Sequence, residues 1–410
     1  MFKFLHAADV HLDSPLVGLE QRADAPAQIL RAATRRALEN MIQLAIDEQV
    51  AFVLLAGDLY DGDWKDYNTG IFLVRQMVRL NEQGIQVLMV SGNHDAANQM
   101  TRSLHLPDNV HHFPPGRAGT RVLDDLGVAV HGRSFATKAV TEDLAAGYPA
   151  AIAGCFNVGL LHTSLDGREG HAEYAPCSLD GLRAKHYQYW ALGHVHAREI
   201  VARDPWIVFP GNTQGRHVRE TGPKGCTLVS VEDLEVRDVR EARLDVLCWS
   251  HCAVDVSGAA TAEAALERVA RRLREQADAA GVRLLAARVV LRGATAAHGA
   301  LKGNPDRWAE ELRALVLDRV GEAAWLEKIA FCTAPESSID LGPLGGLLVE
   351  QEDDGALVAE LAKELTALRA KLPAELLEPP DPIDPTDPKT IEEALRDARG
   401  LLLGRLGGAP

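Results

Sequence analysis

The chain has 410 residues, too many for one ordinary domain, and its 47% hydrophobic and 25% charged content is typical of a globular protein with a sizeable core. Its net charge of −15 disfavours a surface wrapped broadly in nucleic acid, although bound divalent cations would offset part of that charge. No apolar run is long enough to cross a bilayer, so no membrane association is expected. Six scattered cysteines without a Cys-x-x-Cys pair favour a reducing cytoplasm.

Residues 1–250 are predicted to form a layered α/β domain, because short apolar runs alternate with amphipathic stretches of helical spacing. Gly84 is expected to end one helix as its C-cap. Strands are predicted at 2–8, 52–56, 86–90, 128–131, 158–162, 189–192, 207–209 and 227–231, and helices at 27–49 and 69–83.

Residues 251–336 differ from the first 250 residues in sequence pattern and are predicted to form a second, smaller domain. Strand-like runs at 253–256, 284–291 and 329–333 alternate with helical runs at 262–279 and 306–320. The remaining segment, 337–410, carries 15 acidic and 7 basic residues. It is expected to hold helices at 356–371 and 390–406 on either side of a Pro/Asp linker at 378–388. A helix beyond such a linker needs a surface to pack on.

Polar residues that can bind metal follow several of the apolar runs of the first domain. Each motif alone has an ordinary reading as a turn or a satisfied histidine, but together they can converge on one edge of a sheet. Imidazole, carboxylate and amide groups form a mixed nitrogen and oxygen donor set for ions such as Zn, Mn or Fe. The predicted ligands are Asp9, His11, Asp58, Asn93, His162, His194 and His196.

This donor set predicts a two-metal phosphoesterase centre. Two ions about 4 Å apart acidify a bridging water and clamp phosphoryl oxygens. Asp58 is the natural carboxylate to bridge the ions. His94 follows ligand Asn93 and is predicted to act as the acid for the leaving group. Asp95 either orients His94 or caps the helix that follows.

The motifs resemble the calcineurin-like metallophosphoesterase superfamily. Within it, His6-Ala-Ala-Asp-Val-His-Leu-Asp-Ser-Pro15, the stretch 57–70 and Gly211-Asn-Thr-Gln-Gly-Arg-His217 are similar to the bacterial SbcD/YhaO group of DNA repair exonucleases, the YhaO type being the closer match. The resemblance is most specific over residues 1–220. It implies an αββα-type sandwich, a small α+β cap domain at 251–336, and C-terminal helices that dock on an SMC-like ATPase.

The resemblance also implies roles for individual residues. Asp9, His11, Asp58 and His196 would hold one ion, and Asp58, Asn93, His162 and His194 the second, usually as Mn²⁺. His94 would be the catalytic histidine. The chain departs from archaeal and eukaryotic relatives at Asp61, where they carry a second catalytic histidine. A carboxylate can orient water or a metal-bound group but copies an imidazole poorly at neutral pH.

Other residues give weaker signals. Arg216, His217 and Arg133 follow predicted strands and are candidates for binding substrate phosphate, with a surface turn as the alternative. Trp64 and Tyr67 could stack on a base, although packing of a loop is the more common role of such aromatics. The helix at 69–83 could form a homodimer interface, as in the family, or simply pack in the core.

The leading hypothesis is therefore a metal-dependent DNA exonuclease or endonuclease that acts in DNA repair with an SMC-like ATPase. An alternative with the same chemistry is hydrolysis of a small phosphodiester or a phosphoprotein, which the acidic net charge suits. The stretch after Gly57 lacks the arginine that protein phosphatases carry there. A third hypothesis, a non-enzymatic scaffold with a structural metal site, is disfavoured by the complete ligand set.

Overall fold

The computed structural model describes residues 1–14, 26–61, 67–96, 105–165, 174–281, 283–336, 355–371, 384–392, 394–395 and 398. The chain forms two compact units, residues 1–250 with 280–286, and residues 251–279 with 287–410. Predicted features at Trp64, and most of those at 378–388 and 390–406, lie outside the described residues. No described helix is long and apolar enough to span a membrane.

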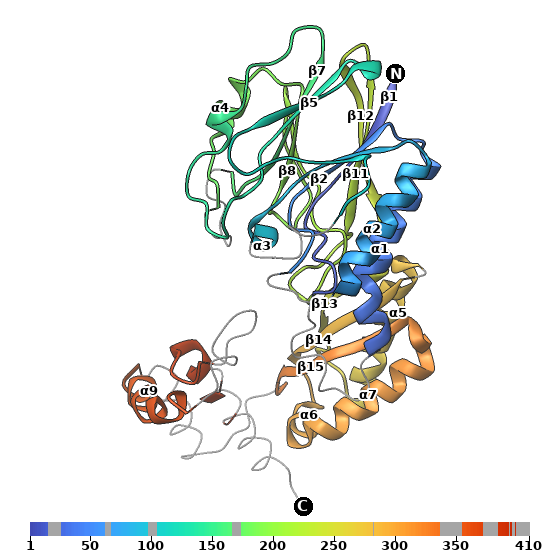
Figure 1. Cartoon of the computed structure of the whole chain (residues 1–410). Coiled ribbons are helices and arrows are strands. Elements are labelled where there is room, and N and C mark those ends of the chain that lie inside the picture. The colour runs from blue at the N-terminus through green and yellow to red at the C-terminus, as the bar shows by residue number, and fades with distance from the viewer. Residues whose placement is uncertain are drawn as a thin grey trace, which may run out of the picture. The chain divides into compact units, whose positions relative to one another are not determined.

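Unit 1 contains two six-stranded sheets (Figure 1). In the first sheet, β1 to β4 are parallel to one another, and β11 and β12 are added antiparallel at the β1 side. Its order is β12 (Glu235–Arg243), β11 (Gly225–Glu232), β1 (Phe2–Ala7), β2 (Phe52–Ala56), β3 (Gln86–Val90), β4 (Val110–His112). The second sheet runs β5 (Gly119–Leu123), β6 (Val128–Gly132), β7 (Phe156–His162), β8 (Tyr189–Gly193), β10 (Trp206–Phe209), β9 (Glu199–Arg203).

All eight predicted strands of unit 1 are confirmed to within a few residues. The strands that were not predicted are the edge strands of the two sheets: β4, β5, β9 and β12. Their side chains are half-buried or exposed, and β12 is dominated by charged residues, as suits a sheet edge. An edge strand has little apolar pattern to reveal it, whereas the central parallel strands are buried on both faces.

The core between the two sheets is rich in aromatic rings. Phe4 stacks on Phe52 with ring centroids 4.9 Å apart and meets Tyr189 edge-on at 5.2 Å. All three side chains are fully buried, as is Phe156. Each such burial stabilises the fold by roughly 1.5–3 kcal/mol, so this shared core holds the sheets face to face.

Two helices cover the outer face of the first sheet and lie side by side (Figure 1). They are α1 (Ala27–Asp47) and α2 (Tyr67–Glu82), and their apolar faces pack on β1, β2 and β3. Gly84 follows α2 with φ of +69°, which confirms the predicted C-cap. The second sheet is covered instead by the short helices η3 (Ala145–Gly147) and α4 (Leu179–Arg183) and by loops. The predicted layered α/β sandwich is confirmed, with one outer layer reduced to short helices.

A three-stranded sheet of order β13-β14-β15 lies mostly in unit 2, together with helices. The predicted alternation of strands and helices is confirmed, with one extra short helix, α6. Asn304 caps α7 by accepting the backbone N–H of Arg307, and Pro305 takes its first position. The elements are β13 (Leu247–Asp255), α5 (Ala262–Ala280), β14 (Leu284–Ala294), α6 (His298–Gly303), α7 (Pro305–Val320), η4 (Gly321–Ala323), β15 (Ala324–Ala334) and α9 (Gly355–Arg369).

The two sheets of unit 1 meet closely at the carboxyl ends of their parallel strands. A Cβ atom on Gly193, the last residue of β8, would lie 2.0 Å from the carbonyl oxygen of Ala56 at the end of β2. Only glycine allows this approach. The ends of β1, β2 and β3 are thereby brought together with the ends of β7 and β8. Residues from five strands can therefore share one site.

Candidate metal centre

One half of the site consists of Asp9, His11 and His196. One donor atom from each lies within 4.8 Å of the others. The Nε2 atoms of His11 and His196 face each other at 3.3 Å, and His196 Nε2 is 3.7 Å from Asp9 Oδ1. Two ring nitrogens and a carboxylate oxygen that converge in this way are suited to hold a cation.

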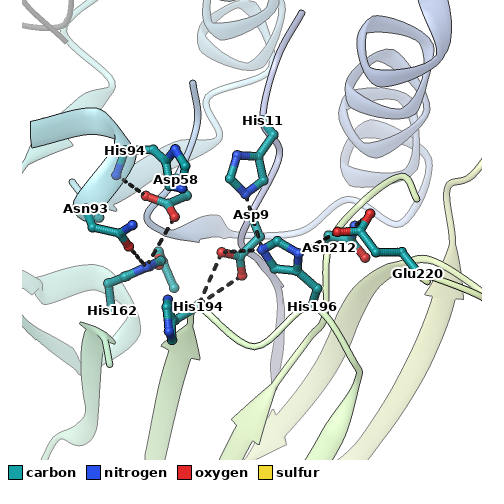
Figure 2. A network of polar contacts seen from close by, with 12 residues as sticks. Asp9, His11, Asp58, Asn93, His94, His162, His194, His196, Asn212 and Glu220 are labelled. Atoms are coloured by element: carbon teal, nitrogen blue, oxygen red, sulfur yellow. Dashed lines mark hydrogen bonds and ion pairs between the residues drawn. The ribbon is translucent and has the colours of Figure 1, made fainter. Parts of the chain in front are cut away.

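The other half consists of Asp58, Asn93 and His162, next to Asp9. His162 Nε2 is 3.0 Å from Asn93 Oδ1 and 3.4 Å from Asp58 Oδ2. Donor atoms of Asp9, Asp58 and His162 lie within 4.8 Å of one another. Asp9 thus belongs to both groups and lies between them (Figure 2). The sharing of Asp58 by two ions stays a prediction.

His194 connects the two halves through its backbone and its ring. Its backbone N–H donates to both carboxylate oxygens of Asp9, at 3.2 and 3.0 Å. Its ring lies edge-on to that of His162, with centroids 5.3 Å apart. The structure therefore brings all seven predicted ligands to one place (Figure 2).

The donor atoms fit divalent cations. His162 Nδ1 lies 2.9 Å from the carbonyl oxygen of Ala56, so it carries a hydrogen, and Nε2 faces two other acceptors, Asn93 Oδ1 and Asp58 Oδ2. Burial opposes protonation of this ring, but the charge and hydrogen bond of Asp58 outweigh it and raise the pKa of His162 to about 9. A proton on Nε2 satisfies the same oxygens that a metal ion would.

The carboxylates respond differently to this environment. Burial opposes ionisation of Asp58, but the neighbouring His162 holds its pKa well below the usual range. Burial raises the pKa of Asp9, against the opposing charges of His196 and His162. Burial, and then the charge of Arg216, keep the pKa of His11 well below its usual value. His11 is thus a neutral ring with the lone pair of one nitrogen available for a metal.

Four of the ligands lie in strained backbone. Asp9, His11 and Asp58 have φ of 51°, 46° and 52°, and His194 has φ of 104°. Non-glycine residues in this region cost about 1–3 kcal/mol each. At these four positions the strain lies where side chains turn from their strands into one site, as is common at functional sites.

His94 lies beside the ligands and has Asp61 as its partner. Its Nδ1 is 2.8 Å from Asp61 Oδ1, and its backbone N–H donates to Asp58 Oδ1 at 2.9 Å. Burial opposes protonation of the ring, but the hydrogen bond to Asp61 and the charge of Asp58 outweigh it and raise the pKa of His94. Ser14 donates to the other oxygen of Asp61. The structure therefore gives His94 the contacts of an acid.

Asp95, which was predicted to act with His94, contacts backbone amides. Its Oδ1 accepts from the N–H groups of Leu59 and Tyr60 at 2.9 and 3.0 Å, and its Oδ2 from that of Gly92 at 3.0 Å. These contacts match the helix-cap alternative and tie the loop after β2 to the loop after β3. Burial and the charge of Asp58 raise the pKa of Asp95 to about 7.

The candidate phosphate-binding residues lie in different settings. Arg216 extends to the site and donates to Asp61 Oδ2 at 3.3 Å. His217 Nε2 is 3.6 Å from Glu220. The guanidinium of Arg133 binds Pro115 O and Glu142 Oε1 at 3.0 and 2.8 Å, so its interactions are with its own neighbourhood. A contact with substrate phosphate stays a prediction for Arg216, His217 and Arg133.

Sequence reasoning missed two polar residues at the site. Glu220 Oε1 is 2.7 Å from His196 Nδ1, and its Oε2 accepts from Asn212 Nδ2 at 2.9 Å (Figure 2). Asn212 lies in the Gly211–His217 motif, which could have pointed to it. Glu220 lies in a loop with no periodic pattern, and only its place four residues after Arg216 offered a signal.

Comparison with known proteins places the chain among phosphoesterases. The calcineurin-like phosphoesterase family matches residues 2–198, and the middle domain of the metallophosphoesterase YhaO matches residues 249–334. An uncharacterised metallophosphoesterase YhaO of Bacillus subtilis is 36% identical over 325 residues, which cover 76% of this chain and 77% of that protein.

Relatives named DNA double-strand break repair protein Mre11 are more distant. The protein from Aeropyrum pernix is 36% identical over 107 residues, 25% of this chain and 24% of its own length. The protein from Sulfurisphaera tokodaii is 24% identical over 268 residues, 60% of this chain and 63% of its own length. With the site geometry and the extent of the YhaO match, the chain belongs to the calcineurin-like metallophosphoesterase family and to its YhaO type.

Proposed function

We propose that this metal-dependent hydrolase is a DNA nuclease, with exonuclease or endonuclease activity, that acts in DNA repair. Proteins of its family bind two divalent metal ions. The observation that carries the proposal is the complete donor set beside the His94–Asp61 pair, in a chain with Mre11 relatives. Those relatives supply the choice of DNA, whereas the site supplies the phosphodiester chemistry.

The residues divide the work of hydrolysis among them. Asp9, His11, Asp58, Asn93, His162, His194 and His196 would hold two ions. Bound there, the ions would supply a nucleophilic hydroxide and neutralise the phosphate. Their nitrogen and oxygen donors suit Mn²⁺, the ion we propose.

His94 would protonate the leaving oxygen. Its Nδ1–H donates to Asp61, so Nε2 is left to hold the proton that is transferred. Asp61 touches neither the leaving group nor an ion in this scheme and acts by orienting the ring. Asp95 would hold the loops of Asp58 and His94 together through the hydrogen bonds that it accepts from their backbone amides.

End-labelled duplex and single-stranded DNA with Mn²⁺ test the nuclease. The wild-type chain should convert the labelled DNA to shorter fragments. The His94→Asn variant should cut the same DNA about 10²–10⁴ times more slowly. His186→Asn is a matched control, because His186 is exposed and precedes β8, whereas the metal ligands follow that strand. No cleavage by the wild type, or equal cleavage by His94→Asn, would contradict the proposal.

We also propose that an SMC-like ATPase binds the C-terminal segment, 337–410. In support, none of the described residues of α9 is buried, and Leu368 is 49% exposed although the helix is amphipathic in pattern. Leu361 and Leu365 are only half-buried. A helix with such an uncovered apolar face gains stability when a partner covers it.

Deletion of residues 337–410, which removes α9 together with the segment after it, tests the partner proposal. The truncated chain should lose binding to the ATPase in a pull-down with purified proteins. It should keep its nuclease activity on simple substrates, because the metal ligands lie in unit 1. Loss of basal activity with unchanged partner binding would refute the assignment.

A homodimer through α2 is a further proposal. Ile71 is 47% exposed and Val78 is 39% exposed. Their positions in the sequence differ by seven, which is about two helical turns, so they lie on the same face of the helix. Large apolar side chains at this spacing suit contact with a second copy of the helix.

The alternative substrate is a small phosphodiester or a phosphoprotein. The net charge of −15 favours it, because an acidic surface repels a long polyanion. High turnover of a cyclic nucleotide by a chain that leaves DNA intact would support this alternative over the nuclease.

A further inference from the structure

We propose that Glu220 is a positioning residue of the metal centre: it fixes the ring of His196 for metal binding and anchors Arg216. The inference rests on the proposed dinuclear centre and deepens it. The side chain of Glu220 is 7% exposed, yet it is surrounded by donors. Its contacts are His196 Nδ1 at 2.7 Å, Asn212 Nδ2 at 2.9 Å, Arg216 N at 2.7 Å, Arg216 Nη2 at 3.3 Å and His217 Nε2 at 3.6 Å.

Glu220 sets which nitrogen of His196 can bind a metal. Glu220 Oε1 lies 2.7 Å from His196 Nδ1, the distance of a ring N–H that donates to a carboxylate oxygen, so Nδ1 carries the hydrogen. The Nε2 lone pair then faces His11 Nε2 at 3.3 Å and Asp9 Oδ1 at 3.7 Å. A histidine ligand whose second nitrogen donates to a carboxylate is fixed in both tautomer and orientation, and its basicity rises.

Hydrogen-bond donors hold both carboxylate oxygens of Glu220 in place. Asn212 and the backbone N–H of Arg216 both donate to Oε2, which leaves Oε1 for the ring. The carboxylate is therefore held in place from several sides, as a positioning group requires.

Arg216 links this carboxylate to the other side of the centre. Its Nη2 lies 3.3 Å from Glu220 Oε1, and its Nη1 donates to Asp61 Oδ2 at 3.3 Å. Asp61 in turn holds His94 at 2.8 Å. A continuous set of polar contacts thus joins metal ligand His196 to the proposed acid, with the Arg216 guanidinium between two carboxylates.

The test is Mn²⁺ binding to the metal-stripped full-length protein, measured by calorimetry and by the electron paramagnetic resonance of free Mn²⁺. The wild type should bind two ions. Glu220→Gln removes the charge while keeping the size, and should weaken one of the two ions by about 10–100-fold. Glu220→Asp, which keeps the charge but shortens the side chain, should have an intermediate affinity and serves if the glutamine variant does not fold.

Two controls separate positioning from general loop support. Glu232→Gln changes a carboxylate of 51% exposure that pairs with Arg237, and should leave both affinities within about threefold of the wild type. Arg219→Met changes an exposed side chain next to Glu220 in the same loop, and should do the same.

A folded Glu220→Gln variant with wild-type affinity for both ions would overturn the proposal. So would an Arg219→Met variant that loses as much affinity, since Glu220 would then act only by holding the loop. Because DNA is absent from these measurements, two bound ions without DNA cleavage would contradict only the nuclease assignment.

Discussion

Replacement of Asp61 by asparagine should slow hydrolysis by weakening the support of His94. Asp61 Oδ1 lies 2.8 Å from His94 Nδ1, and its other oxygen accepts from Ser14 and Arg216. An asparagine keeps the size of the side chain and one acceptor atom. It removes the negative charge that favours the protonated ring.

The structure sets the size of the effect. A hydrogen bond to a charged group contributes about 1.5–3 kcal/mol. The His94 and Asp61 side chains are 31% and 21% exposed, so solvent screens the pair and favours the lower end. A loss of about 1.4 kcal/mol corresponds to a tenfold fall in kcat. His94→Asn should cost about 10²–10⁴-fold, because it removes the acid itself.

The assay is hydrolysis of a deoxydinucleotide with saturating Mn²⁺, because its alkoxide leaving group needs a proton from an acid and its small size limits any dependence on DNA binding. In the double variant, Asp61→Asn should add little to the loss caused by His94→Asn, since one residue acts through the other. A full tenfold loss from Asp61→Asn in the His94→Asn background would refute this reasoning, as would a single variant with wild-type kcat.

Three further outcomes follow from packing and charge. Gly92→Ala should weaken Mn²⁺ binding by about tenfold or more, because its Cβ would lie 2.3 Å from a carboxylate oxygen of the centre; Gly116→Ala, with open space around it, should not. Burial lowers the pKa of His6 to about 3 in the folded chain. As pH falls below about 6.5, the unfolded chain therefore binds a proton at His6 that the folded chain does not bind. The unfolding free energy of the metal-stripped protein should therefore fall by up to about 1.4 kcal/mol for each unit that the pH falls. In urea titrations at several pH values, the His6→Gln variant should show a smaller fall. Ile71→Glu with Val78→Glu should convert a dimer to monomers in light scattering, and an unchanged mass above the monomer's would contradict an interface on α2.

The residues that the structure gathers at the candidate site could be predicted from the sequence alone. Asp9, Asp58 and Asn93 each follow a run of apolar residues, and the carboxyl ends of parallel strands meet at one edge of a sheet. The central strands were predictable for the same reason, since burial on both faces requires continuous apolar runs. The polar edge strand β12 left no such pattern and was missed.

Only the tertiary structure decided which groups support the ligands. Asp95 directly follows His94 in the chain and Asp61 lies far from it in sequence, yet Asp61 contacts the ring and Asp95 contacts backbone amides. Glu220 reaches His196 across 24 residues, through a loop without periodic sequence. Metal ligands must follow strand ends and so leave a spacing that can be read. A supporting carboxylate needs only to arrive within hydrogen-bonding distance from any direction, which packing in three dimensions determines.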